Sequence, residues 1–158
     1  MRKALFVLSI VGLLAVGSAT SATADQGYRT ERVPITTTAA GLAAGYQPLD
    51  YGQAVNIHAE GPTIFAVENI LLRGAKPSTT FVGQRWVYAG NCSGPFVGAL
   101  YDERDIHTTD AHGFMQNTRF IYPSDIPMHD TDLGVAFVLV DGNGVPVYAT
   151  PCTNVHID

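Results

Sequence analysis

Short runs of β-branched and aromatic residues fill the sequence from about Tyr46 onward, separated by glycine, proline, asparagine and aspartate clusters. Apolar and polar residues alternate within these runs, as in Val55, Ile57 and their neighbours, and no stretch repeats with the period of an amphipathic helix. The sequence therefore predicts strands at residues 54–60, 63–72, 80–89, 96–101, 106–109, 114–122, 135–141, 145–150 and 155–157. This pattern is typical of an all-β protein, and we expect an antiparallel β-sandwich with a Greek-key connection.

Two turns set the expected pairing. Residues 141–144 (Asp-Gly-Asn-Gly) and 110–113 (Asp-Ala-His-Gly) lie between strand patterns, and their glycine and asparagine residues tolerate the positive φ of tight hairpins. We therefore expect a hairpin at each position. The run 135–140 is apolar on both faces, which indicates a central strand.

The N-terminus reads as an export signal. Arg2 and Lys3 precede an apolar stretch at 4–16, and Ala22-Thr23-Ala24 fits an A-x-A cleavage site. A membrane span would need about 20 apolar residues, and this run is shorter. We expect a signal peptide at 1–24, cleavage near Ala24, and a secreted or periplasmic protein. Residues 25–50 lack a strand or helix period and suggest an arm or linker, for which pairing with the sheet near residues 33–35 is one alternative. This leaves a single β-domain at 51–158.

Two cysteines remain after cleavage, Cys92 and Cys152. Exported proteins form disulfides readily, so we expect these two to be joined. The bond would tie the middle of the chain to its C-terminus.

Composition excludes several classes of protein. Hydrophobic residues make up 46% of the chain and charged residues only 15%, which is a folded composition. Without the leader, 7 basic residues would face 14 acidic ones, and no two basic residues are adjacent. Such a chain would repel nucleic acids and anionic membranes. An extracellular protein or glycan is the partner that the sequence favours, and the sequence leaves the oligomeric state open.

The segment 72–82, Leu-Arg-Gly-Ala-Lys-Pro-Ser-Thr-Thr-Phe-Val, resembles a turn of fibronectin type III and related immunoglobulin-like domains. In that family a leucine, a proline and small polar residues precede an aromatic residue that opens the next strand. The resemblance implies an immunoglobulin-like fold, with a binding role by analogy. Phe81 stands where the family usually has tyrosine, so the hydroxyl that ties down the corner is missing at this position.

Histidines and acidic residues provide candidate metal ligands. His107 and His112 flank the turn at 110–113, and with Asp110 and His129 they form a candidate copper or zinc set. This set supports an alternative function as a metal-binding protein or small metal-dependent oxidoreductase. The acidic segments 102–105, 130–132 and 141–143 are candidates for a weak surface calcium site.

Catalytic motifs are weak, and an interaction role is favoured. Ser93 is offset from the G-x-S-x-G pattern of hydrolases. Trp86, Tyr88, Phe96 and Tyr101 lie close to Cys92 in the sequence, either as core beside the disulfide or as an exposed surface for sugar rings or a protein. We therefore expect a non-enzymatic binding or cell-surface interaction module, whose contacts come from polar loops at one end of the sandwich, at 102–110 and 123–132. A barrel closed around a small apolar ligand is a third interpretation.

Overall fold

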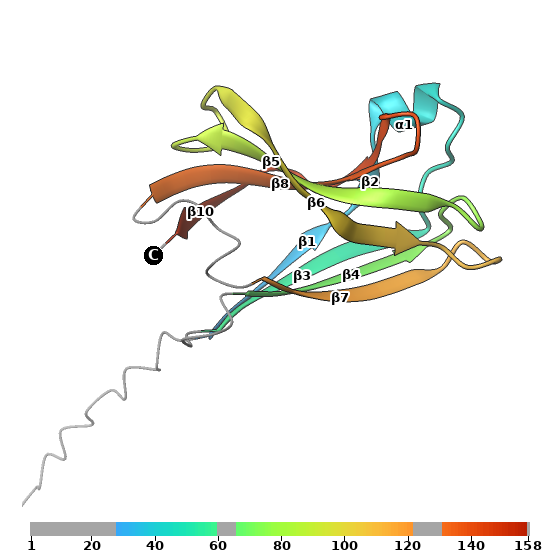
Figure 1. The fold of residues 1–158 in the computed structure, drawn as a ribbon, viewed down its shortest axis with the longest axis horizontal. Helices are drawn as coiled ribbons and strands as arrows, with labels where there is room; N and C mark the ends of the chain where they lie inside the picture. Colours follow the sequence, from blue (N-terminus) through green and yellow to red (C-terminus); the bar gives the residue numbers. More distant parts are fainter. Residues whose placement is uncertain (1–27, 60–65, 122–130, 158) are drawn as a thin grey trace, which may run out of the picture.

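The computed structural model of the chain describes residues 28–59, 66–121 and 131–157 (Figure 1), with side chains described at 32–55, 68–100, 105–119 and 131–154. The expected leader at 1–24 and the candidate ligand His129 lie outside the described residues.

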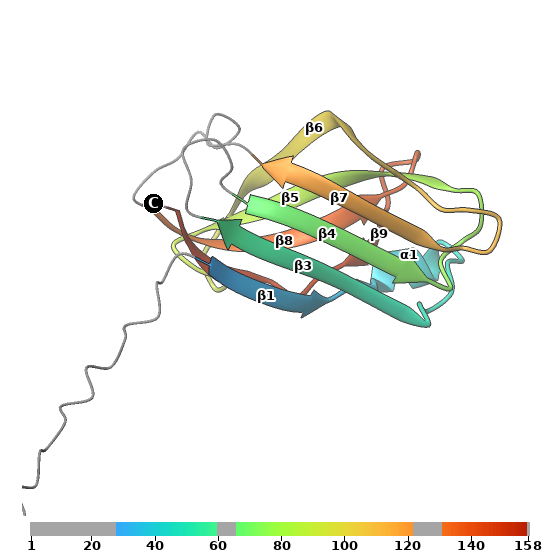
Figure 2. The same ribbon diagram turned by 90° about the horizontal axis from the view of Figure 1, so that it is seen from below.

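Two antiparallel sheets face each other in two layers (Figure 1), and Figure 2 looks onto the smaller of them. The four-stranded sheet has the order β1-β3-β4-β7, and the six-stranded sheet has the order β2-β9-β8-β5-β6 with β10 also paired to β8. The elements are β1 (Tyr28–Pro34), β2 (Thr36–Thr37), α1 (Ala39–Ala43), β3 (Tyr51–Ala59), β4 (Ala66–Arg73), β5 (Thr80–Ala89), β6 (Phe96–Thr108), β7 (Met115–Ile121), β8 (Thr131–Val140), β9 (Pro146–Ala149) and β10 (Thr153–Ile157).

Each predicted strand overlaps an observed one, and β5 has the predicted bounds. The all-β, antiparallel character is confirmed. β8 is central, because it pairs with β5 on one side and with β9 and β10 on the other. The sheets have separate edges, so the structure does not support the closed barrel.

The hairpin expected at 110–113 is wrong, although the turn itself forms. Gly113 has φ +74°, and the Asp110 carboxylate accepts hydrogen bonds from the backbone N–H groups of His112 and Phe114. However, β6 pairs with β5 while β7 pairs with β4, so this turn carries the chain from one sheet to the other. Sequence pattern locates a turn, but it does not say in which sheet the next strand will pair.

A bulge replaces the loop expected between 101 and 106. Four residues of β6, 102–105, stand opposite the single residue Gly83 of β5, so the two predicted strands form one continuous β6. Extra residues in a bulge re-aim nearby side chains, and here Asp105, the last residue of the bulge, points between the sheets.

The segment expected as an arm is part of the folded body. β1 pairs with β3 and β2 with β9, so this part of the chain passes from one sheet to the other around Ile35. Ile35 and Tyr46 are buried in the core. The weakly apolar stretch also forms the five-residue helix α1, capped by Thr38, whose hydroxyl accepts a hydrogen bond from the Gly41 N–H.

The core lies between the sheets, toward the end that includes α1. It contains residues from both layers: Ile35, Tyr46, Ile70, Leu72, Ala75, Phe81, Met115, Phe137, Leu139, Val147 and Tyr148. Phe81 and Tyr148 meet edge to face with ring centroids 5.4 Å apart. Both rings belong to the six-stranded sheet, and the same core includes Ile70, Leu72 and Met115 of the four-stranded sheet.

Tyr148 provides a hydroxyl for the loop that resembles the fibronectin corner. The loop crosses from β4 to β5, and Phe81 at its end is fully buried without a polar tip. The Tyr148 hydroxyl instead accepts a hydrogen bond of 3.2 Å from the Lys76 backbone N–H. The hydrogen bond that holds this loop therefore comes from β9, which is far away in the sequence.

The disulfide between Cys92 and Cys152 is confirmed. It joins the turn of the β5–β6 hairpin to the link between β9 and β10. Gly134 of β8 lies beneath this turn, and a Cβ there would come within 2.6 Å of the Cys92 nitrogen. The bond therefore spans the six-stranded sheet across its central strand.

Candidate functional sites

A cluster of charged side chains lies between the two sheets. Arg85 of β5 forms ion pairs with Glu68 of β4 and with Asp105 of β6. Arg119 of β7 places Nη1 2.8 Å from Asp105 Oδ2. We call these four residues the ionic cluster. It links the two sheets, and its two positive and two negative charges balance.

Burial makes this balance necessary. The Asp105 side chain is only 2% exposed and the Arg85 side chain 12%. Burial alone raises the pKa of Asp105, but contact with His107 and the charge of Arg85 outweigh it and hold that pKa well below its usual range. Burial lowers the pKa of Arg85, and the neighbouring Glu68 and Asp105 more than reverse this. Both groups therefore stay charged, because each has a charged partner.

His107 extends the cluster toward the core. Asn117 Nδ2 lies 3.2 Å from His107 Nδ1, and because an amide nitrogen can only donate, Nδ1 accepts. The neutral ring then carries its proton on Nε2, which lies 2.8 Å from Asp105 Oδ1. Nε2 is not aligned for a hydrogen bond to that oxygen, and it forms no hydrogen bond with any other described residue. The ring packs edge to face on Phe137, 5.8 Å between centroids, and solvent does not reach it.

Gly83 makes room for the buried carboxylate and the imidazole. A Cβ at this position would lie 2.5 Å from Asp105 Oδ2 and 2.8 Å from His107 Nε2. Any side chain at 83 would therefore displace one of the two groups from its partner.

We expect Gly83→Ala to lower the free energy of unfolding by about 1–3 kcal/mol, as overpacking of a filled interior does. Gly98→Ala is the matched control, because a Cβ at that strand glycine meets nothing within 4 Å. Urea denaturation of both variants checks this expectation. Equal stability of the two variants would show that the interior at Gly83 is looser than described.

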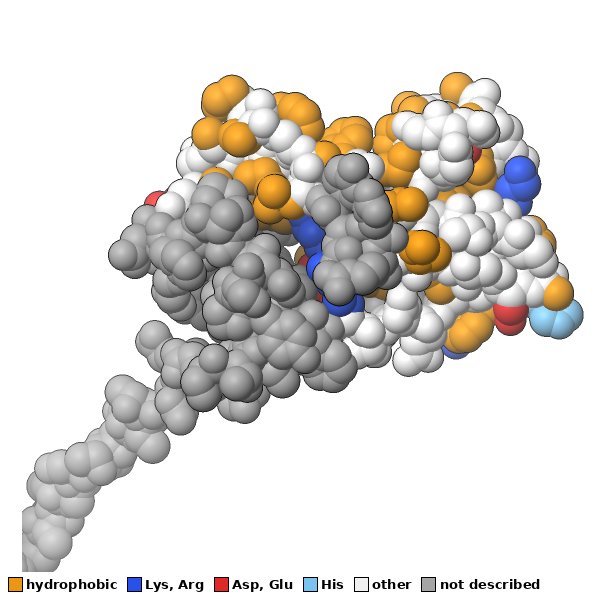
Figure 3. All heavy atoms as spheres, viewed as in Figure 1, with side chains coloured by type: hydrophobic (Ala, Val, Ile, Leu, Met, Phe, Trp, Pro, Cys, Tyr) orange, Lys and Arg blue, Asp and Glu red, His pale blue; other side chains and the backbone are white. Residues whose placement is uncertain are grey.

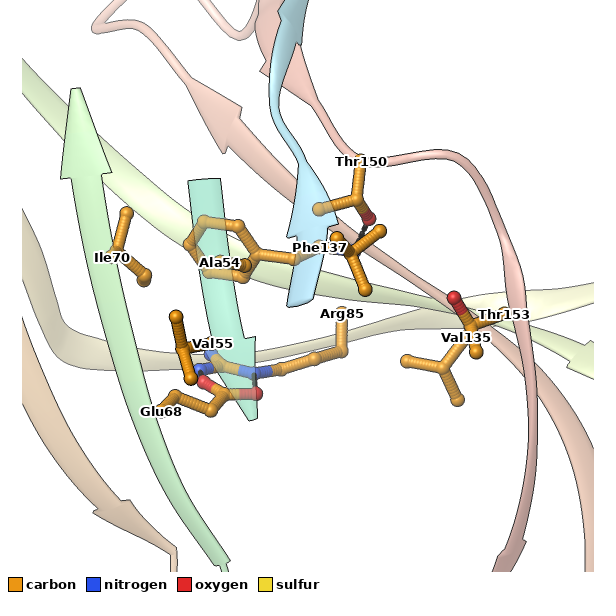
Figure 4. Close-up of a pocket in the computed structure, with 10 residues that line it drawn as sticks. Ala54, Val55, Glu68, Ile70, Arg85, Val135, Phe137, Thr150 and Thr153 are labelled. Atoms are coloured by element: carbon orange, nitrogen blue, oxygen red, sulfur yellow. Dashed lines mark hydrogen bonds and ion pairs between the residues drawn. The ribbon is translucent and has the colours of Figure 1, made fainter. Parts of the chain in front are cut away.

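A small cavity of about 60 Å³ adjoins the ionic cluster (Figure 4). Apolar residues such as Val55, Ile70 and Phe137 make up most of its wall, while Arg85 and Glu68 meet on one side. The hydroxyl of Thr150 is turned to the backbone, where it accepts a hydrogen bond from the Phe137 N–H. A space of this size holds a few water molecules.

The structure separates the candidate metal ligands. His107 is buried between the sheets, whereas His112 is exposed at the turn and Asp110 is engaged with the backbone of that turn. The hairpin that would have brought the two rings together is absent, because β6 and β7 belong to different sheets. Among the side chains that are described, no three His, Cys, Asp or Glu residues gather closely enough to hold a metal ion.

The acidic segments proposed for calcium have other roles where they are described. Asp105 faces arginines, and the Asp141 carboxylate accepts hydrogen bonds of 2.9 Å from the N–H groups of Asn143 and Val145. Tyr46 also donates to Asp141, at 2.8 Å. Burial and this hydrogen bond raise the pKa of Tyr46 to about 12, so its hydroxyl remains a donor. In segment 130–132, Asp130 lies outside the described residues and the other two belong to β8.

A surface of one exposed and two half-buried aromatic side chains lies near the disulfide. Trp86 and Tyr88 share the outer face of the six-stranded sheet, as alternation predicts, and Phe96 of β6 stands opposite Tyr88. The Phe96 ring centroid is 5.8 Å from that of Trp86 and 5.6 Å from that of Tyr88, and Phe96 is 55% exposed. We call Trp86, Tyr88 and Phe96 the aromatic surface. Figure 3 shows hydrophobic side chains gathered over this hairpin at the upper left.

The two interpretations of the aromatic residues both hold in part. Trp86 packs against a buried cluster of Ala136, Val138 and Val140, as does Cys152, so it lies beside the disulfide as predicted for a core residue. Phe96 faces solvent instead. The side chain of Tyr101 lies outside those described, although its backbone pairs with Gln84.

Sequence reasoning missed the ionic cluster, although one signal was present. On β5, Arg85 occupies the same face as the buried Phe81 and Val87, and a charge on an apolar face indicates a buried partner. Nothing local identifies Glu68 and Arg119 as its neighbours, because they reach it from the other sheet.

Within the described residues, no helix has the length and hydrophobicity to cross a membrane. Comparison of the whole chain with protein-family models, with curated proteins and with solved structures finds no match that assigns it to a family.

Proposed function

We propose that this chain is an exported, non-enzymatic interaction module that binds an extracellular or envelope protein through its aromatic surface. The observation that carries the proposal is the exposure of Phe96, flanked by Trp86 and Tyr88, on the outside of a sheet. Exposed clusters of large apolar side chains are costly in water and commonly mark binding sites. Aromatic residues are also enriched among the side chains that dominate binding energy.

The geometry of the rings favours a protein partner over a glycan. A sugar ring stacks best on a flat aromatic face. Phe96 instead makes interplanar angles of 65° with Trp86 and 62° with Tyr88, so the three rings pack edge to face. Such a surface offers ridges and hollows that suit apolar side chains.

The ionic cluster supports a structural role rather than a catalytic one. Asp105 and Glu68 are both held by arginine side chains, and His107 is closed off from solvent. Groups so engaged are poor candidates to bind a substrate or exchange a proton with it.

Export and an immunoglobulin-like sandwich complete the proposal. The leader pattern at 1–24 and the disulfide favour an oxidising compartment. Two antiparallel sheets with a shared core support the sandwich, as does the corner between β4 and β5.

We expect Phe96→Asp to weaken binding of the chain to its protein partner at least tenfold. The loss of an aromatic anchor and the burial of a charge both disfavour the complex. The tagged, exported chain would be titrated against extracellular and envelope proteins of its producing organism. Phe114→Asp is the matched control, because Phe114 is also exposed, at 36%, but lies beside the turn between the sheets. Equal loss of binding by the two variants, or no binding by the wild-type chain, would contradict the proposal.

A further inference from the structure

The outer face of the four-stranded sheet is uncovered and rich in polar side chains. Figure 2 looks onto this face, and no other described element lies in front of its strands. On β4 and β7 the outward residues alternate with the buried Ile70, Leu72 and Met115. Half-buried Leu71 is one of the outward residues. We call six others, on all four strands, the polar face: Arg32, Tyr51, Gln53, Asn69, Arg73 and Gln116.

The two arginines of the polar face are exposed and unpaired in the described part of the chain. Neither Arg32 nor Arg73 forms an ion pair or a side-chain hydrogen bond with a described residue. The carboxylate of Asp50 lies past the end of β4 and forms no ion pair with Arg73. By contrast, Arg85 and Arg119 are both paired between the sheets. In a chain of net charge −5, two free cations on one face favour an anionic ligand there.

Strand register sets the spacing of these two charges. Arg32 stands opposite residue 55 of β3 and Arg73 opposite Tyr51, and Gln53 lies midway between those two positions. Neighbouring strands about 4.8 Å apart and a rise of about 3.3 Å per residue place the two arginine Cα atoms about 16 Å apart. An extended polymer with several anionic groups along its length can reach both arginines, whereas a single small anion cannot.

Side-chain amides lie between and beside the arginines. The Tyr51 hydroxyl donates to Gln53 Oε1 at 2.6 Å, which leaves the amide nitrogen of Gln53 as a donor for a ligand. The side-chain amides of Asn69 and Gln116 form no hydrogen bond with a described residue. An amide both donates and accepts, as a sugar hydroxyl does, so the two kinds of group suit each other. Tyr51 is the one aromatic residue of the polar face, which therefore lacks the cluster of apolar anchors typical of protein interfaces.

We propose that the polar face binds an acidic polysaccharide of the uronic acid type. Arg32 and Arg73 pair with its carboxylates, for which the planar guanidinium group is well shaped, and the amides bind its hydroxyls. Duplex DNA carries one charge per about 1.7 Å, and the net negative charge of the chain opposes so dense a polyanion more strongly. The polar face and the aromatic surface lie on opposite sides of the sandwich (Figure 1), so a polysaccharide and a protein can bind together.

Titration calorimetry of the exported chain with polygalacturonate and with alginate tests the proposal, with methyl-esterified polygalacturonate as the neutral control. We expect at least one acidic polymer to bind, more weakly as salt is raised, and the ester not to bind. Arg32→Gln and Arg73→Gln should each weaken binding by about threefold or more. Lys76→Gln removes the same charge from a loop where Lys76 lies over the Tyr46 ring, and it should leave binding unchanged. Thermal unfolding of each variant confirms that it is folded.

Four results would overturn the proposal. Absence of binding to both acidic polymers would remove the ligand class, and equal binding of the ester would remove the role of charge. An equal loss in Lys76→Gln would mean that net charge matters and the polar face does not. Equally tight binding of duplex DNA or of anionic phospholipid vesicles would mean that any polyanion suffices. Binding of a protein through Phe96 is measured separately and can survive each of these results, so the two proposals fail independently.

Discussion

Replacement of Asp105 by asparagine should lower the free energy of unfolding by about 3–5 kcal/mol, which is the cost of breaking a buried ion pair. The change keeps the shape of the side chain but leaves Arg85 and Arg119 with Glu68 as the only carboxylate of the cluster. Chemical denaturation of the purified exported chain measures the effect. Because the cluster joins the two sheets, we expect the unfolding transition to remain a single one.

A combined variant and the pH dependence separate the charge from the packing. Glu68→Leu, Arg85→Met, Asp105→Leu and Arg119→Met together replace the whole cluster, and we expect them to recover much of the loss, as apolar replacements of buried ion pairs often do. The folded-state pKa of Asp105 lies below the unfolded value of about 3.9, so its contribution is present above that pH and is lost as the pH falls below it. Asp105→Asn should therefore flatten the acid limb of the stability curve. An acid limb as steep as that of the wild-type chain would contradict this account of the cluster.

Removal of the disulfide should lower the free energy of unfolding by about as much as Asp105→Asn does. Cys92 and Cys152 are 60 residues apart, and closure of a loop of that length stabilises the folded state by about 4 kcal/mol in the chain-entropy model. We expect the double variant Cys92→Ala and Cys152→Ala to lose about that much, measured by thermal unfolding at neutral pH.

The aromatic surface offers a second readout of the same change. Trp86 is the only tryptophan and packs, like Cys152, against the buried cluster on the outer face of the sheet. Its fluorescence should therefore change when the bond is removed. The double variant should also bind the partner less tightly, because the β5–β6 turn is no longer tied to the β9–β10 link. Unchanged stability and unchanged fluorescence would show that the bond contributes little to this end of the molecule.

The sequence predicted the strands because their signals are local. Alternation and β-branched residues locate β3 and β5, and the glycine-rich turns locate most strand ends. The disulfide followed from the number of cysteines and from the expected export. None of these arguments depends on which strand lies beside which.

Features that depend on pairing between distant segments were not predicted. The turn at 110–113 looks the same whether the next strand continues its own sheet or begins another, so the hairpin was predicted and the crossover was not. The segment 25–50 has weak periodicity, so pairing was expected only near residues 33–35, whereas β1 is paired with β3 from Tyr28 to Pro34. The same limit hid the ionic cluster, since its members come from four strands in two sheets.

The aromatic surface was predicted in part. Alternation placed Trp86 and Tyr88 on one face, but whether that face is covered is a property of the whole fold. The structure shows Trp86 partly covered and Phe96 exposed, so the most accessible ring of the aromatic surface belongs to β6.

Site-specific photo-crosslinking in the producing organism tests the central claim most directly. A photoreactive phenylalanine analogue would replace Phe96 in one strain and Phe114 in another, so that each exposed ring reports on its own surroundings. The account predicts a discrete protein adduct from position 96 and little or none from position 114. No adduct at position 96 beyond that at position 114 would contradict the claim that this surface binds a protein.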